Sequence, residues 1–430
     1  MTAFDKMGPL EVKDLHTKLS EEYEAEKIKG LSLDLSRGKP ASDQLELSSG
    51  LDDMIGGNYI AMDGTDVRNY GQLRGIEEAR VLGAKLIGCS PEEVICWNNS
   101  SLSLMNIVLN LAQNRGLWGD NRKWSLSKNQ KILAPVPGYD RHFTLTERAG
   151  IKMISVPMEN SGPDTNKILE LVSQDPEVKG IWCVPKFSNP TGCTYTPACV
   201  KFMAELPKIA AANDFIVMWD NAYAVHDLAF PMENLTEIMA IAKKIKTDEH
   251  IISFASTSKI TYPSGGIAFI ASGPLVLEEV TQYLSTLSIG PDKVNQLRHA
   301  RFLNGRLEAH MKKHAKLLNP KFELVQKILK DELEPLGIAE WTSPSGGYFI
   351  SVNAISGTAQ RVGELSSEAG LNITPPGATF PYGIDPRDSN LRIAPTYAGL
   401  DELNSGLKLL SLCIKIAALE TKLKRANQLE

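Results

Sequence analysis

Three polar side chains follow three short apolar runs, and their types could together serve one cofactor. Asn189, Asp220 and Lys259 each come shortly after such a run, in that order along the chain. The runs are residues 180–185, 215–219 and 251–255. Short runs rich in β-branched and aromatic residues are typical of buried strands. Ligands of open α/β sheets bind at strand ends, so we expect these three side chains to meet there.

A lysine and a carboxylate at neighbouring strand ends indicate pyridoxal phosphate chemistry. This cofactor needs a lysine amine for its Schiff base and a carboxylate at its pyridinium nitrogen. Taken singly, Lys259 and Asp220 could be ordinary residues where a strand leaves the core, and Asn189 could belong to an ordinary Asn-Pro-Thr-Gly turn. Their joint order and setting favour a cofactor site over three unrelated turns.

The elements that must position these residues alternate along the chain. Helical patterns and short apolar strands, including residues 131–134 and 151–156, alternate from about 73 to 290. This alternation predicts an α/β fold with a mainly parallel sheet covered on both faces. Further elements are expected as an amphipathic helix over 11–28, mostly helical structure over 293–335 interrupted at Asn319-Pro320, a strand at 346–352 and a last helix after Asp401.

Several motifs, in their order and spacing, resemble those of class I aminotransferases of the fold-type I pyridoxal phosphate family. They are Tyr70-Gly71-Gln72-Leu73-Arg74-Gly75, Asn189-Pro190-Thr191-Gly192, Asp220-Asn221-Ala222-Tyr223, Ser256-Thr257-Ser258-Lys259 and Asn390-Leu391-Arg392-Ile393. The segments 35–40, 99–102 and 137–143 resemble the branch called type Ic aspartate aminotransferases, whose aminotransferase domain is related to that of MocR-type regulators.

This resemblance implies the domain organisation and the reaction. The expected architecture is a PLP-transferase fold of type I, with a large cofactor-binding domain over 50–305. A smaller α+β domain is expected from 1–49 and 306–430. The implied enzyme moves an amino group between an L-amino acid, aspartate or glutamate, and a 2-oxo acid. It is expected to be a homodimer with shared active sites.

The resemblance also implies roles for individual residues. Lys259, Asp220 and Tyr223 are the expected catalytic residues. The expected cofactor contacts are Ser100, Ser101, Leu102, Tyr139, His142, Asn189, Asp220, Tyr223, Ser256, Ser258 and Lys259, with Tyr70 reaching the neighbouring subunit's phosphate. The expected substrate contacts are Gly38, Asn189, Arg392 and Arg37, of which Arg392 binds the α-carboxylate. Ser100 also precedes an apolar helical face, and a helix N-terminus binds anions.

One departure concerns cations. Many class I members carry a phosphate-contacting arginine about eight residues after the lysine, but residues 260–267 contain none. The arginine that commonly binds a second substrate carboxylate is also missing near Gly290. The candidates for that role are Arg37, Lys39 and Arg141. The amino acid's side-chain specificity is not decided by the sequence.

The composition indicates which partners and which cellular compartment to expect. The 430 residues carry a net charge of −5, which argues against nucleic acid as a main partner. Neither a secretory leader nor an apolar stretch of membrane-spanning length is visible. The six cysteines form no CxxC pair and the histidines show no ligand spacing, so we expect no metal site and a cytoplasmic protein.

Two other functions fit part of this pattern. Another pyridoxal phosphate reaction, such as β-elimination, uses the same lysine and aspartate. A transcriptional regulator that uses this fold as an effector sensor would need a DNA-binding domain before it. Only one acidic helix precedes the resemblance, which begins near Leu33. Transamination is therefore the favoured prediction.

Overall fold

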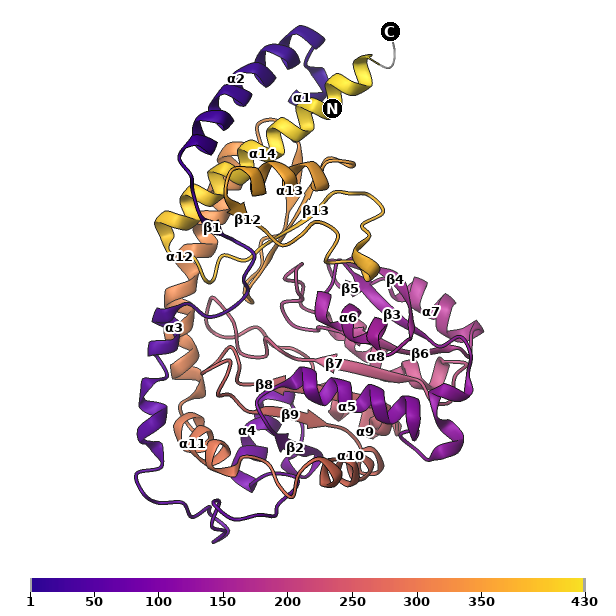
Figure 1. Cartoon of the computed structure of the whole chain (residues 1–430). Coiled ribbons are helices and arrows are strands. Elements are labelled where there is room, and N and C mark those ends of the chain that lie inside the picture. The colour runs from indigo at the N-terminus through magenta and orange to yellow at the C-terminus, as the bar shows by residue number, and fades with distance from the viewer. Residues whose placement is uncertain (1, 428–430) are drawn as a thin grey trace.

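The computed structural model describes residues 2–427 and is built around an eight-stranded sheet (Figure 1). The strand order is β2-β9-β8-β7-β6-β3-β4-β5. The bounds are β2 Val94–Trp97, β3 Lys131–Val136, β4 Lys152–Glu159, β5 Gly162–Pro163, β6 Val178–Cys183, β7 Ile216–Asp220, β8 Ile251–Ser256 and β9 Ala268–Ala271. The five strands from β8 to β4 are parallel, whereas β9 is antiparallel to both its neighbours and β5 to β4. The predicted mainly parallel sheet is thus confirmed.

Alternate side chains of the central strands enter two different cores. In β7, Val217 and Trp219 pack in one hydrophobic cluster, and Ile216 and Met218 pack in the other. Because successive side chains of a strand point to opposite faces, this alternation shows that both faces are covered. One cluster includes α4 (Glu77–Ile87), α8 (Pro197–Ile209) and α9 (Ile238–Ile245), and the other includes α5 (Ser101–Asn114) and α10 (Pro274–Leu287).

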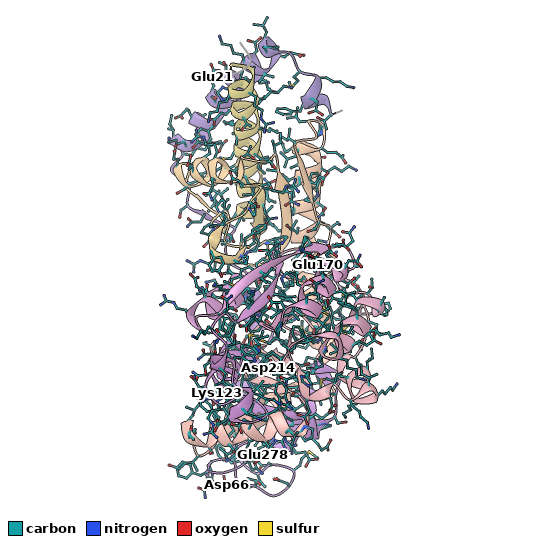
Figure 2. All side chains as sticks on the ribbon, turned by 90° about the vertical axis from the view of Figure 1, so that its right-hand side faces the viewer. Glu21, Asp66, Lys123, Glu170, Asp214 and Glu278 are labelled. Carbon is teal, nitrogen blue, oxygen red and sulfur yellow. The ribbon has the colours of Figure 1, made fainter. Side chains whose placement is uncertain are left out.

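A second unit lies at one end of the molecule and contains both termini (Figure 1). Its sheets are β10-β11-β13 and β1-β12. Their bounds are β1 Leu33–Asp34, β10 Ala339–Trp341, β11 Ile350–Ala354, β12 Leu371–Asn372 and β13 Asn390–Ile393. A separate hydrophobic cluster joins these strands to α2 (Pro9–Ile28), α12 (Leu307–Leu333), α13 (Ala359–Glu368) and α14 (Leu400–Asn427). In Figure 2 Glu21 of α2 and Asp66 lie at opposite ends of the molecule. The domain boundaries 49/50 and 305/306 remain a prediction.

The remaining helices are short or connect these units. They are α1 Ala3–Lys6, α3 Ser42–Glu46, α6 Asp140–Arg148, α7 Thr165–Gln174 and α11 Lys293–Leu303. No helix within residues 2–427 is long and apolar enough to cross a membrane.

The helices at the two termini form as predicted, but the expected interruption at Asn319-Pro320 is wrong. The helix α12 continues through Pro320, and the break falls at Asn304-Gly305-Arg306 instead, where Gly305 has a φ of +76°. A proline removes one backbone donor from a helix. Here the residue four positions earlier, Lys316, is exposed, and buried Leu318 and Phe322 hold the helix on either side. Packing therefore outweighs the local penalty.

The strand predicted at 346–352 begins later, at Ile350. A Cβ on Gly346 would lie 2.3 Å from the Phe187 ring, and Gly347 has a φ of +82°. The two glycines therefore let the chain pass close to the loop after β6 before the strand starts.

Candidate active site

A cavity of about 290 Å³ opens where β6, β7 and β8 end and α5 begins. Ten of the predicted site residues line it: Ser100, Ser101, Leu102, Tyr139, Asn189, Asp220, Tyr223, Ser256, Ser258 and Lys259. The other lining residues are Asn99, Val184, Ala222 and Pro263. Asn189, Asp220 and Lys259, which are far apart in the sequence, therefore share one site, as expected from parallel strands that end at the same sheet edge.

Lys259 lies three residues beyond β8, on a turn that brings its amine into the cavity. Its Nζ lies 5.0 Å from the centre of the Tyr223 ring. Burial lowers the pKa of the Lys259 amine, and the negative charge of Asp220 partly opposes this shift. The amine therefore loses its proton at a lower pH than an exposed lysine, which suits a nucleophile and a base.

Asp220, the last residue of β7, is buried and is paired on one side only. His142 of α6 donates from Nε2 to Asp220 Oδ2 across 3.0 Å, and the His142 ring stacks on Trp182 of β6 with centroids 4.2 Å apart. The second carboxylate oxygen, Oδ1, is buried and has no protein donor among the described residues. An unpaired buried carboxylate oxygen is costly, so this atom suits a cationic N–H of a bound group.

The cavity lining also offers donors for an anion. Ser100 caps α5, its side chain accepting from the Ser103 N–H, and the first N–H groups of this 14-residue helix have no partner within it. Two more hydroxyls lie nearby: Ser256 Oγ donates to Ser258 Oγ across 3.1 Å. Within the described chain, the only cationic side chain in the lining is Lys259. Hydroxyls and a helix N-terminus are therefore the donors that this part of the lining offers an anion.

Arg392, on β13, reaches the cavity's edge and contacts Asn189. Its Nη1 donates to Asn189 Oδ1 at 3.2 Å and to Asp140 Oδ1 at 3.1 Å, and its Nε donates to Thr374 Oγ1 at 3.1 Å. The guanidinium also lies 4.8 Å above the Phe349 ring. These contacts hold it in one orientation although it is almost fully buried. An arginine fixed in this way can present its remaining N–H groups to a carboxylate.

The other predicted substrate contacts lie outside the cavity lining. Gly38 packs so closely on Phe349 that a Cβ would lie 2.1 Å from its ring. Arg37, whose side chain is 58% exposed, pairs with Asp34 at 2.5 Å. Lys39 lies 4.1 Å above the Tyr397 ring. Arg141 makes a loose 3.9 Å contact with its neighbour Asp140.

Tyr70, the residue predicted to act in a neighbouring subunit, does not reach the cavity of its own chain. It is 76% exposed within the protomer. Its role in a neighbouring subunit stays a prediction.

Sequence reasoning missed two contacts of the site. Trp182 supports His142 by stacking, and Asp140 pairs with Arg392. Trp182 lies in an apolar run that predicts a strand, but its stacking on His142 depends on how the chain folds. Asp140 and Arg392 are 252 positions apart, so no local pattern could have joined them.

A mainly parallel sheet with a lysine beyond one strand, an aspartate at the end of the next and a helix N-terminus at the same cavity is the arrangement expected of a fold-type I transferase. The comparisons agree. A family profile described as aspartate amino-transferase matches residues 7–427. The aspartate aminotransferase of Corynebacterium glutamicum is 42% identical over 411 residues, 94% of this chain and 94% of that protein. A crystal structure of an aspartate transaminase from the same organism has a TM-score of 0.91 at 41% identity, covering 95% of this chain and 97% of that one.

The chain therefore belongs to the aspartate aminotransferase family, and the protein is an aminotransferase. The predicted relation to regulators is distant. An uncharacterized HTH-type regulator of Bacillus subtilis, YdfD, is 22% identical over 298 residues, 67% of this chain and 57% of its own length.

Proposed function

We propose that this aminotransferase uses pyridoxal 5'-phosphate to move the amino group of aspartate or glutamate to a 2-oxo acid. The observation that carries the proposal is the meeting of Lys259, Asp220 and Asn189 at one cavity, with Arg392 at its edge. The 42% identity to an aspartate aminotransferase supports both the reaction and the choice of a dicarboxylic amino acid.

The residues present fit the cofactor. Asp220 Oδ1 is a buried acceptor that needs a donor, which a protonated pyridine nitrogen supplies. Tyr223 and Asn189 would hold the ring oxygen, Tyr139 would cover one ring face, and Ser256 with the α5 N-terminus would hold the phosphate. When bound, pyridoxal phosphate supplies an electron sink for the substrate's α-carbon.

The chain's own groups divide the remaining work. The Lys259 amine, whose pKa is lowered by burial, would take the proton from the substrate's α-carbon. It would then donate that proton to the carbon that carried the cofactor's aldehyde. Arg392 would bind the α-carboxylate, which orients the substrate against that amine. His142 would keep Asp220 in place, since its hydrogen bond and its stacking on Trp182 restrict both side chains.

The test is transfer of the amino group itself. Purified protein with pyridoxal phosphate should move ¹⁵N from labelled aspartate to 2-oxoglutarate and give labelled glutamate and oxaloacetate. Alanine as donor is the control for specificity. Release of ammonia with a 2-oxo acid from one amino acid alone, without an acceptor, would instead support an elimination reaction and would contradict the proposal.

We also propose a homodimer in the cytoplasm. Exposed Tyr70 supports a shared site, because its motif is one that would serve a neighbouring subunit. The six cysteines are all free thiols, which suits a reducing compartment.

A further inference from the structure

The turn that carries Lys259 leaves two peptide carbonyls without backbone partners. The N–H groups of Ile260 and Thr261 both donate to the Thr257 carbonyl, at 2.9 and 2.8 Å, and close one turn after β8. In the described chain, no backbone N–H donates to the carbonyl of Lys259 or of Ile260. Buried carbonyls need donors, so side chains must supply them.

Four side chains converge on these two carbonyls from distant parts of the chain. The Lys259 carbonyl accepts from His226 Nε2 at 3.2 Å and from Tyr348 Oη at 3.4 Å. The Ile260 carbonyl lies 2.8 Å from His310 Nε2 and 3.0 Å from His314 Nε2, and these two ring nitrogens lie 3.1 Å apart. A carbonyl oxygen has two lone pairs, so His226 and Tyr348 fill the acceptor capacity of the Lys259 carbonyl, and the histidine pair supplies a donor to the Ile260 carbonyl.

Gln44 gives two of these donors their direction. Its amide Nε2 donates to His314 Nδ1 at 3.3 Å and to Tyr348 Oη at 3.0 Å, and its Oε1 accepts from the Ala41 N–H. Because His314 Nδ1 accepts, the proton of the neutral ring sits on Nε2, facing the Ile260 carbonyl. Because the Tyr348 hydroxyl accepts from Gln44, its own proton points to the Lys259 carbonyl.

The network is buried and uncharged. Gln44, His314 and Tyr348 are each at most 1% exposed. Burial, together with the neighbouring His310, lowers the pKa of His314 to about 4, and burial raises the pKa of Tyr348. Neither group therefore changes charge near neutral pH, and the hydrogen bonds keep one direction.

We propose that Gln44, His314 and Tyr348 are positioning residues that fix the peptide of Lys259 and thereby the place of its amine in the cavity. They come from outside the eight-stranded sheet: Gln44 from α3, His314 from α12, and Tyr348 from the segment before β11. The inference rests on the proposed role of Lys259. It adds that the lysine is placed by distant residues as well as by β8.

The decisive comparison is His314→Gln with His314→Leu. A glutamine can place its amide nitrogen close to the position of histidine Nε2 and can donate to the Ile260 carbonyl, whereas leucine cannot. We expect His314→Leu to lower kcat about 10- to 100-fold, because small misplacements of a reacting group have effects of this size. The KM for aspartate should change little, since Arg392 is untouched. His314→Gln should recover most of kcat.

Two further variants test the direction of the network. Gln44→Glu keeps an acceptor for the Ala41 N–H but removes both donors, so it should lower kcat as His314→Leu does. Tyr348→Phe removes one of the two donors to the Lys259 carbonyl and leaves His226 as the other, so it should have a smaller effect. If His314→Leu does not fold, Tyr348→Phe still tests the network.

A second measurement does not depend on turnover. In the cofactor-free protein, hydrogen exchange of the peptide covering residues 257–267 should speed up in His314→Leu and Gln44→Glu, and exchange in β6 should not. The rate at which Lys259 is reductively methylated, followed by mass spectrometry, should change in the same variants. Unchanged exchange and methylation, or equal activity of His314→Gln and His314→Leu, would overturn the proposal. A wild-type protein without transaminase activity would contradict the proposed function and leave the exchange test of the network intact.

Discussion

His142 donates one hydrogen bond to Asp220, at 3.0 Å, and the other carboxylate oxygen of Asp220 has no donor among residues 2–427. The pair is buried, and Trp182 stacks on the His142 ring. The carboxylate is thus held from one side and available on the other, which is the arrangement that a cationic ring nitrogen requires. This relationship separates the role of Asp220 from that of His142 and allows each to be tested.

Asp220→Ala should retain the covalent attachment of cofactor but lose about 10²–10³-fold in kcat, as is typical for removal of one electrostatic contact at a reacting centre. His142→Asn should have a smaller effect, because Asp220 stays in place with less restraint. Steady-state rates with aspartate and 2-oxoglutarate measure both. If Asp220→Ala turned over like the unaltered protein, the aspartate would be structural only.

Lys259→Ala should abolish the long-wavelength absorption of the protein–cofactor complex and nearly all turnover. The alanine has no amine to attach the aldehyde and none to move the proton. Absorption spectra before and after addition of aspartate provide the measurement, and Lys179→Ala, which removes a buried lysine paired with Asp214 outside the cavity lining, is the control. Full activity in the Lys259 variant would sink the proposed mechanism.

The lowered pKa of Lys259 also predicts a change in stability. In the unfolded chain this amine has an ordinary lysine pKa, so between that value and the lower folded value the unfolded state binds more protons than the native state. Burying the charged amine costs the native state free energy. This cost is fully present below the pKa of Lys259 in the folded protein, and it disappears as pH rises through the pKa of Lys259 in the unfolded chain. Lys259→Met should therefore raise the Tm of the cofactor-free protein at neutral pH, with a difference that shrinks toward pH 11. Calorimetry of both proteins at pH 7 and pH 10 is the measurement. A Tm difference that is the same at both pH values would show that burial does not lower the pKa of Lys259.

Much of the site was predictable because it depends on strand ends. Asn189, Asp220 and Lys259 follow apolar strands. A parallel sheet brings the ends of such strands to one edge, and this does not depend on the conformation of the loops. The positions of β2 and β9 were not predicted, since apolar runs of only four residues leave no clear strand pattern. The contacts of Gln44 with His314 and Tyr348 could not be predicted either. They span 270 and 304 positions and depend on how the second unit packs against the Lys259 turn.

The shared site leads to a complementation test. Tyr70 is exposed in one protomer, and we expect it to complete the site of its partner. Mixed dimers of a Tyr70→Ala chain and a Lys259→Ala chain should contain one site with both lesions and one with neither. Their activity should approach half that of the unaltered dimer. No recovery in mixed dimers, verified by differential tagging and mass spectrometry, would argue against a shared site, and Tyr382→Ala is a matched control for an exposed tyrosine.

Selectivity for a dicarboxylic substrate is the least constrained feature of the site, and three cations compete for it. Arg37 is a candidate because it adjoins Gly38, an expected substrate contact. Its guanidinium, however, pairs with Asp34 at 2.5 Å. Lys39 stacks over Tyr397. Arg141, two residues after the cavity-lining Tyr139, makes a loose contact with Asp140. A second carboxylate excluded from water must be matched by a cation.

We expect Arg37→Ala to lower kcat/KM for aspartate far more than for alanine, by about 2–4 kcal/mol in transition-state free energy. Asp34→Ala is the informative companion. It frees Arg37 from its ion pair and should leave aspartate selectivity intact or increase it if Arg37 binds the substrate. Lys39→Ala and Arg141→Ala, measured with the same two substrates, provide the comparison. Equal losses for aspartate and alanine in Arg37→Ala, with a selective loss in Arg141→Ala, would move the second-carboxylate contact to the N-terminal turn of α6, beside the pair formed by Asp140 and Arg392.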